Sequence, residues 1–417
     1  MPLRSILICS QTRMKRTILA SLLALCAIAG QAQGTLNSNS VSPDSVIIEG
    51  IATNMPDGTR LNYAQEGWEK MQETIIKDGK FRIAICQKEK KTTLYLVQYG
   101  PTLEIYTEPG KRIKVIGNGA QTVNYWHVES DNFEQKEYDL YNQFIKENIP
   151  DFYEADNKCR LAQVKLTEKS MNGTLTREDQ EKAMPEIKAL SQKTEALRKE
   201  KYNAAMLDFM KDRPFSKRFM TELWMIAIYD QTPAIVEKAR EIFKKTPEEA
   251  MNEKFVVEAK ARLYADQVKV GEQMKDFTLF DRQGNKHQLS EFKGKYTILE
   301  FTYVGCVACQ LVKPVLDDFY KRNKDKVEVV AIYYDTEKDW MAEGEKHEVS
   351  FHEWNDHARS AEPVAAYGVR AYPTFVIIDP NGKILDIKES ASGFYEIIKK
   401  YIPDAEVEKK LENARNS

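Results

Sequence analysis

The sequence predicts a multidomain protein with an N-terminal all-β, sandwich-like domain, a central α-helical region and a C-terminal α/β domain. The chain has 417 residues, which is enough for more than one domain at roughly 100–200 residues each. The apolar pattern also changes twice along the chain, from short alternating runs to helical periodicity, and then to strands alternating with helices. These changes place the domains at residues 33–130, 131–267 and 268–417, after a signal peptide at 1–32.

Short apolar runs separated by turn signals mark the N-terminal domain. Dipeptides such as Asp78-Gly79 separate the runs, which lie at residues 46–48, 81–85, 94–97 and 103–106. Runs of this length between turns are typical of β-strands. No convergent set of titratable side chains stands out here, so we expect this domain to serve in binding, docking or spacing.

Helical periodicity characterises the central region. Apolar residues recur at helical spacing at 133–149, 161–171, 177–210 and 219–229. Two more helices are expected to start at Thr232-Pro233 and Thr246-Pro247, because a threonine can cap a helix and a proline suits its first turn. We expect this region to form packed helices without a catalytic role.

Strands and helices alternate in the C-terminal region. Strands are predicted at residues 277–279, 296–303, 327–334, 374–378 and 383–386. Helices are predicted up to residue 323 and over 392–401. Alternation of this kind favours an α/β domain with a central sheet covered on both faces.

Two cysteines lie where this domain changes from strand to helix. The Cys306-Val307-Ala308-Cys309 tetrapeptide follows the apolar run at 296–303, and helical spacing begins after it. Cys306 should therefore open a helix, where free N–H groups and the helix dipole lower the pKa of a thiol. Cys309 follows one turn later on the same face. This pattern indicates a redox-active thiol pair.

A metal site is not expected. Zinc would need two further ligands at matching spacing, and neither Cys86 nor Cys159 nor any histidine forms a second pair. His347, His352 and His357 recur every five residues, which places them on neither one helix face nor one strand face. We interpret their segment as a solvated connection.

The N-terminus is typical of an exported protein. Lys15-Arg16 precede an apolar stretch at 18–29, and Gly30-Gln31-Ala32 supplies the small residues of a cleavage site. The start codon is Met1 or Met14. A lipidated Cys26 is the minor alternative, because Leu25 stands where a small residue is normal. We therefore predict a periplasmic protein, with an outer-membrane lipoprotein as the alternative.

Cysteine use and charge add two expectations. After cleavage, Cys86 and Cys159 are the only cysteines outside the CxxC pair, and we expect them to be buried free thiols. Lysine and arginine total 61 against 63 acidic residues, without a basic stripe, which argues against a nucleic-acid partner. The sequence leaves the oligomeric state open.

Several separate motifs resemble the thioredoxin-like superfamily. Within it they are similar to the exported TlpA/ResA-type thiol-disulfide oxidoreductases, grouped with the AhpC/TSA-like domains. The resemblance covers residues 270–401 and rests on the segments at 270–279, 289–295, 306–309, 367–374 and 379–383, with Pro314. Residues 45–119 are similar to an uncharacterised β domain found upstream of such exported domains.

The resemblance implies a set of site residues. Pro373 would be a cis-proline facing the disulfide, and the backbone before it, at Ala371, would pair with a substrate chain. Tyr372 and Gly305 would flank the bound substrate. Glu300 matches a buried carboxylate beneath the resolving thiol, which suits proton transfer with Cys309, although pairing with a neighbouring lysine is the alternative. Gly305 stands where the family commonly has tryptophan, and Ala308 where it commonly has proline.

The function that follows is thiol-disulfide exchange. Cys306 and Cys309 would exchange electrons with cysteine-containing envelope proteins, a membrane-bound donor would restore the dithiol, and no cofactor beyond the Cys306–Cys309 disulfide is implied. One alternative is a thiol-dependent peroxidase, although Tyr303 stands where those enzymes place threonine or serine. The other is a non-enzymatic envelope binding protein with a structural CxxC disulfide. Substrate and redox direction stay open.

Overall fold

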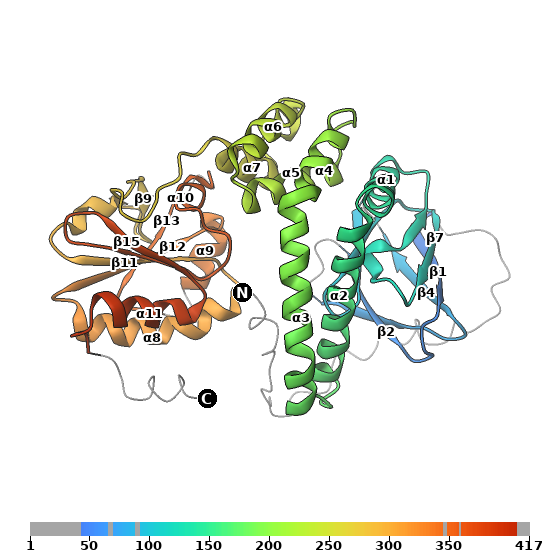
Figure 1. The fold of residues 1–417 in the computed structure, drawn as a ribbon, viewed down its shortest axis with the longest axis horizontal. Coiled ribbons are helices and arrows are strands. Elements are labelled where there is room, and N and C mark those ends of the chain that lie inside the picture. The colour runs from blue at the N-terminus through green and yellow to red at the C-terminus, as the bar shows by residue number, and fades with distance from the viewer. Residues whose placement is uncertain (1–42, 66–69, 88–91, 345–347, 358–359, 407–417) are drawn as a thin grey trace. The chain divides into compact units, whose positions relative to one another are not determined.

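A computed structural model describes residues 43–65, 70–87, 92–344, 348–357 and 360–406 (Figure 1). The predicted signal peptide, with Cys26, lies outside these residues. The chain forms two compact units, of which one contains the residues up to Ala205 with 216–218, and the other contains 206–215 and the residues from Phe219 on. Both unit boundaries fall inside the predicted helical region. Within the described residues, no helix combines the length and apolar character needed to cross a membrane.

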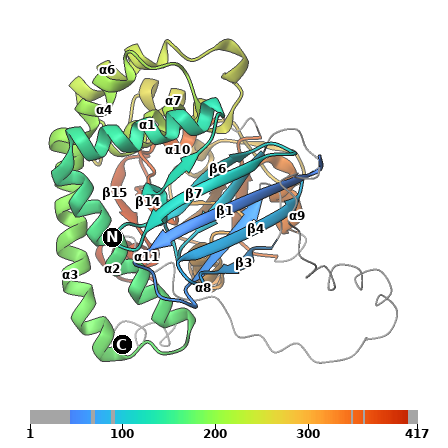
Figure 2. The ribbon, with the colours of Figure 1, turned by 90° about the vertical axis from the view of Figure 1, so that its right-hand side faces the viewer.

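The first unit begins with the predicted all-β domain, which is a sandwich of two four-stranded sheets (Figure 2). One sheet has the order β4-β1-β7-β8, and the other has the order β3-β2-β5-β6. Alternate residues of β4 are buried, so Phe81, Ile83 and Ile85 enter the core between the sheets. The strands are β1 (Ser45–Thr53), β2 (Arg60–Gln65), β3 (Gln72–Ile75), β4 (Lys80–Cys86), β5 (Thr92–Val97), β6 (Thr102–Thr107), β7 (Arg112–Asn118) and β8 (His127–Glu129).

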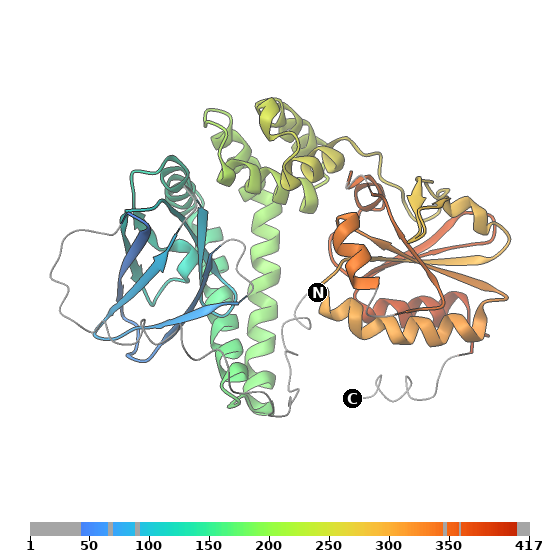
Figure 3. The ribbon, with the colours of Figure 1, turned by 180° about the vertical axis from the view of Figure 1, so that it is seen from behind.

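Three helices follow in the same unit: α1 (Phe133–Asn148), α2 (Pro150–Met171) and α3 (Arg177–Leu197). The side chain of Asn132 caps α1, and Thr176 forms a capping box with Asp179 at the start of α3. Helices α2 and α3 lie side by side (Figures 1 and 3). Helix α2 starts earlier than predicted, because its first turns bury polar residues such as Asp156 and Asn157 that hide the apolar period.

The remaining helices of the central region are α4 (Asn203–Met210), α5 (Lys217–Tyr229), α6 (Pro233–Phe243) and α7 (Lys254–Tyr264). Helix α6 begins at Pro233 as predicted, but the Thr232 side chain makes no capping hydrogen bond. The helix expected at Thr246-Pro247 is wrong in position. Only a 3₁₀ turn, Glu248–Ala250, follows this proline, and α7 begins at Lys254.

The C-terminal domain contains a seven-stranded mixed sheet with the order β10-β9-β13-β12-β11-β14-β15. Strands β11, β12 and β13 are parallel, and β14 runs antiparallel to β11. The strands are β9 (Leu279–Phe280), β10 (Lys286–His287), β11 (Tyr296–Thr302), β12 (Val327–Tyr333), β13 (His352–Asn355), β14 (Thr374–Ile378) and β15 (Ile384–Glu389). The helices are α8 (Val307–Asn323), α9 (Glu337–Gly344), α10 (Glu362–Ala366) and α11 (Ala391–Tyr401). The predicted α/β architecture is confirmed.

Apolar clusters cover both faces of this sheet. Helices α8 and α11 lie on one face (Figures 1 and 3), where Leu316 and Phe394 join the cluster beneath β11 and β12. On the other face, Val364 of α10 packs with Leu299 and Val330. All seven residues of β12 are buried, as expected for a central strand with both faces covered. This packing fixes the end of β11 against the start of α8.

Two expectations about single residues are wrong. His352 lies in β13, opposite Val330 of β12, and not in a solvated connection, while His347 lies outside the described residues. Cys86 is exposed, because the alternation of β4 turns it away from the core. Cys159 is buried, as expected.

Candidate active site

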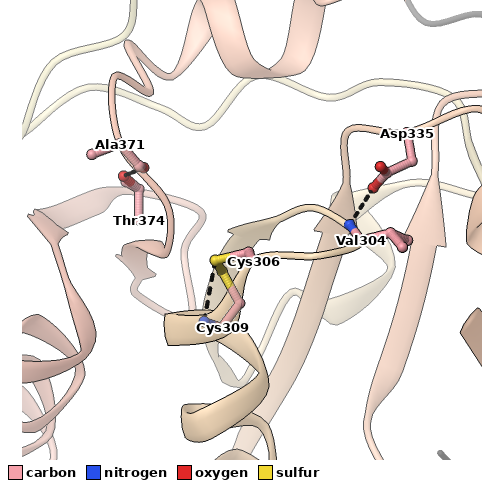
Figure 4. Close-up of a disulfide and its surroundings, with 6 residues drawn as sticks. All are labelled: Val304, Cys306, Cys309, Asp335, Ala371 and Thr374. Carbon is pink, nitrogen blue, oxygen red and sulfur yellow. Dashed lines mark hydrogen bonds between the residues drawn. A yellow bond between two sulfur atoms is a disulfide. The ribbon is translucent and has the colours of Figure 1, made fainter. Parts of the chain in front are cut away.

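The two cysteines of the tetrapeptide form a disulfide where β11 gives way to α8 (Figure 4). Their Cα atoms are 5.3 Å apart. Cys306 is the N-cap residue of α8, as predicted, and its Sγ accepts a hydrogen bond from the backbone N–H of Cys309 at 3.2 Å. Gly305, directly before it, has a φ of +88°, in the left-handed region that favours glycine. This backbone requirement accounts for a glycine where the family commonly has tryptophan.

A second loop meets the disulfide loop. The Tyr372–Pro373 peptide bond is cis, as predicted from the resemblance, and the Tyr372 ring contacts the Tyr303 ring at a centroid distance of 5.2 Å. Within this loop, the Thr374 hydroxyl donates to the Ala371 carbonyl at 2.6 Å (Figure 4). The ring contact thus places the cis-proline loop next to the residues that precede the disulfide, although the two loops lie far apart in the sequence.

The loop before the disulfide is held by a carboxylate from the next strand. Asp335, two residues beyond the end of β12, accepts a hydrogen bond from the backbone N–H of Val304 at 2.8 Å (Figure 4). Sequence reasoning missed Asp335. The only signal available was its position after a buried strand, because the carboxyl ends of parallel strands meet at one edge of a sheet.

The disulfide is almost fully buried. Cys306 and Cys309 are each 4% exposed. Three apolar residues close to it in the sequence are open to solvent: Tyr303 is 39% exposed, Val307 45% and Leu311 58%. We call these three residues the apolar rim. The buried disulfide therefore has exposed apolar residues close to it in the sequence.

Glu300 occupies the centre of β11 and is 2% exposed. Burial raises the pKa of its carboxyl to about 8, and the negative charge of Glu353 acts in the same direction while Lys313 opposes them. Within the described residues, its Oε1 has no hydrogen-bond partner. Lys313, which lines the same cavity as Glu300, forms its ion pair with Glu353, at 2.7 Å. The geometry thus favours a protonated carboxyl near neutral pH over a simple ion pair.

Glu300 and Cys309 line the same cavity. This cavity has a volume of about 370 Å³, and its wall also includes Lys313, Tyr333 and Glu348. A carboxyl group and the second cysteine therefore line one cavity. Such an arrangement is suited to moving a proton between a carboxyl oxygen and a sulfur atom, because both groups face the same cavity.

Helix α7 contributes a buried ion pair beside the cis-proline loop. Arg262 Nη2 lies 2.8 Å from Glu258 Oε1, and their side chains are 2% and 6% exposed. The Tyr334 hydroxyl, next to β12, donates to Glu258 at 3.4 Å. The charges of this pair also act on Tyr372, whose pKa is raised mainly by burial. The i,i+4 spacing of the pair is visible in the sequence, but its burial is not.

The histidines make other contacts. His352 lies 3.0 Å from Glu328 through Nε2, and His357 stacks on the Phe280 ring. No group of three or more metal-binding side chains occurs among the residues that the structure describes. The absence of a metal cofactor remains a prediction.

The C-terminal domain is similar to known proteins. Residues 270–387 match the AhpC/TSA family. The chain is 32% identical over 124 residues to the thioredoxin-like protein YneN of Bacillus subtilis (strain 168), covering 29% of this chain and 71% of that relative. It is likewise 32% identical over 122 residues to the thiol-disulfide oxidoreductase ResA of Geobacillus thermodenitrificans (strain NG80-2), covering 29% of this chain and 69% of the relative.

The chain is also similar to solved structures. A thiol:disulfide interchange protein from Bacteroides sp. shares 24% identity, with a TM-score of 0.30, and the alignment covers 33% of this chain and 91% of that one. The match to the AhpC/TSA family, at residues 270–387, contains the CxxC pair, Glu300 and the cis-proline loop. By sequence, the chain belongs to the thioredoxin-like AhpC/TSA family, among the ResA-type thiol-disulfide oxidoreductases.

Proposed function

We propose that the chain exchanges its CxxC dithiol or disulfide with cysteines of envelope proteins. The observation that carries this proposal is the Cys306–Cys309 disulfide at the start of α8. Tyr303, three residues before Cys306, contacts Tyr372, which forms the cis peptide bond with Pro373. A thiol at a helix N-terminus is stabilised as a thiolate by the backbone N–H groups and the helix dipole. Cys306 therefore attacks, and Cys309 resolves.

The exchange proceeds in two steps. The Cys306 thiolate attacks one sulfur of a partner disulfide, the partner S–S bond breaks, and the other partner sulfur leaves as a thiolate. Cys309 then loses its proton and attacks Cys306, which releases the second partner sulfur and closes the Cys306–Cys309 bond. Two electrons pass to the partner. A membrane-bound dithiol donor returns two electrons and restores the reduced pair.

Glu300 serves as the proton acceptor and donor for Cys309. It is buried in the shared cavity, and its pKa of about 8 is close to the ordinary thiol value of about 8.5, which favours transfer in either direction. The Ala371 backbone pairs with the extended partner chain, in the manner of an added strand, while Tyr372 and Gly305 border it.

The proposal is tested with Cys309→Ala. This variant retains the attacking thiol but cannot resolve, so it should accumulate mixed disulfides with envelope proteins and with a scrambled-disulfide substrate. Cys306→Ala is the matched control and should trap nothing. The native protein should reduce insulin with a thiol donor. Peroxide consumption without insulin reduction would favour the peroxidase, and no trapped partner together with no insulin reduction would favour a structural disulfide.

The apolar rim should contribute to substrate binding. Fully burying a leucine side chain is worth about 1.5–3 kcal/mol, and Leu311 is 58% exposed before a substrate covers it. Leu311→Ser should therefore lower kcat/KM for a peptide disulfide with apolar flanking residues by about fourfold to twentyfold. Reaction with a small dithiol should not change, because such a molecule does not cover the rim. Met341→Ser, at an exposed apolar residue of α9, is the control. An equal loss with the peptide disulfide and the small dithiol would contradict a role in binding.

We also propose that the protein acts in the periplasm. The support is the N-terminal pattern of Lys15-Arg16, an apolar stretch and a small-residue cleavage site. N-terminal sequencing of the protein recovered from the periplasmic fraction should place the cleavage after Ala32. An intact N-terminus in the cytoplasmic fraction would contradict export, while modification at Cys26 would indicate the lipoprotein.

A further inference from the structure

A second group of buried charges borders the cavity that holds Glu300 and Cys309. Lys313 Nζ lies 2.7 Å from Glu353 Oε1, and the side chains of this pair are 13% and 8% exposed. The Tyr333 hydroxyl donates to the same carboxylate oxygen at 2.8 Å and accepts from Lys313 at 3.2 Å. These three residues come from α8, β12 and β13, and Lys313 and Tyr333 line the cavity together with Glu300.

The other oxygen of Glu353 is also occupied. Arg282 donates to Glu353 Oε2 from Nη2 at 3.0 Å and from Nε at 3.2 Å, and its guanidinium lies 4.5 Å from the centroid of the Trp340 ring. Glu353 therefore faces two cations. The cluster of Lys313, Arg282 and Glu353 has one positive charge in excess, which an ionised Glu300 would balance.

The charged and titratable groups around Glu300 act in opposite directions. From α8, Cys309, Lys313 and Asp317 line its cavity. Tyr333 lines the cavity from β12, and Glu348 lines it from the segment before β13. Glu353 acts from β13, whereas the neighbour on β14 is the apolar Phe375. Lys313 lowers the pKa of Glu300 and Glu353 raises it, in addition to the larger effect of burial. Lys313 therefore stands between two carboxyl groups that compete for its charge.

We propose that Lys313 and Glu353 are positioning residues that set the pH at which Glu300 exchanges a proton with Cys309. This inference rests on the proposed role of Glu300. Lys313 stabilises the ionised Glu300 to the extent that Glu353 leaves its charge available, and Arg282 holds Glu353 in place. Neither Lys313 nor Glu353 touches the reacting sulfur atoms in this assignment, and both act through Glu300.

The experiment measures the pH profile of the resolving step in variants of the full chain. In this profile, the rate changes over the pH range in which Glu300 ionises, and we call this part the Glu300 limb. Lys313→Met should move the Glu300 limb to higher pH by about one unit, because the variant loses the positive charge that stabilises the ionised carboxyl. Glu353→Gln should move it downward by a similar amount, because Lys313 is then free to face Glu300. Lys313→Arg keeps the charge and should restore the native profile. Arg322→Met, an exposed charge on the same helix, should leave the profile unchanged.

A structural role would not produce opposite shifts. Both substitutions should also lose their effect when Glu300 is replaced by glutamine. Shifts of the two variants in the same direction would overturn the assignment. An unchanged pH profile in Lys313→Met would also overturn it, and this test remains valid even if Glu353→Gln fails to fold. Infrared absorption of the protonated Glu300 carboxyl, assigned by its loss in Glu300→Gln, gives the same shifts without turnover. If these infrared shifts appear but the protein shows no thiol-disulfide exchange, the proposed function is refuted, whereas the effect of Lys313 and Glu353 on Glu300 stands.

Discussion

Glu300→Gln is expected to stabilise the protein relative to the native chain as pH rises, by up to about 5 kcal/mol above pH 8. In the folded state, burial holds the pKa of Glu300 at about 8, against an ordinary value of 4.5. Between pH 4.5 and pH 8, Glu300 is therefore ionised in the unfolded chain but keeps its proton in the folded chain. The native chain therefore loses stability across this window, whereas the glutamine variant has no proton to retain.

The measurement compares urea unfolding of both proteins near pH 4.5 and above pH 8. Tryptophan fluorescence can report the relevant unit, which contains Trp224, Trp340 and Trp354. Glu328→Gln is the matched control, and its expected change in stability has the opposite sign, because the pKa of Glu328 is lowered and not raised. Burial alone would raise the pKa of Glu328, but hydrogen bonds from Lys295 and other neighbours lower it, so that variant should lose stability at neutral pH. A difference between Glu300→Gln and the native chain that does not change with pH would contradict a raised Glu300 pKa.

Arg262→Leu is expected to destabilise the C-terminal unit by about 3–5 kcal/mol, because it leaves the Glu258 carboxylate buried without its cation. The loss should also disturb the Tyr372 loop, since Glu258 accepts from Tyr334 and its charge acts on Tyr372. Urea unfolding gives the stability change. A slower exchange reaction with protein substrates in the folded variant would report the effect on the loop.

Two comparisons separate the ion pair from the loss of a large side chain. Arg322→Leu removes a partly exposed arginine that is also paired at i,i+4 spacing, and it should cost less than about 1 kcal/mol. The double variant with Glu258→Leu and Arg262→Leu should recover much of the stability, because apolar residues can replace a buried ion pair at little cost. If the double variant is as unstable as Arg262→Leu, the unpaired carboxylate is not the cause.

Much of the fold follows from local patterns. The buried run of β11, the helical spacing of α8 and the position of Cys306 between them were predictable, because each depends on residues within a few turns of one another. Strand β13 was not predictable. Its residues, His352–Asn355, show no apolar alternation, and they form a strand because β12 supplies backbone partners.

The sequence by itself determined the three-part fold class, the thiol pair at a helix start, and through the family resemblance the cis-proline and the buried glutamate. Only the tertiary structure decided that the disulfide is buried, that Lys313 pairs with Glu353 rather than with Glu300, and that α7 contributes a buried ion pair that acts on Tyr372. The physical reason is the distance along the chain over which each property is determined. Backbone conformation responds to nearby residues, whereas burial and charge pairing depend on which distant elements pack together.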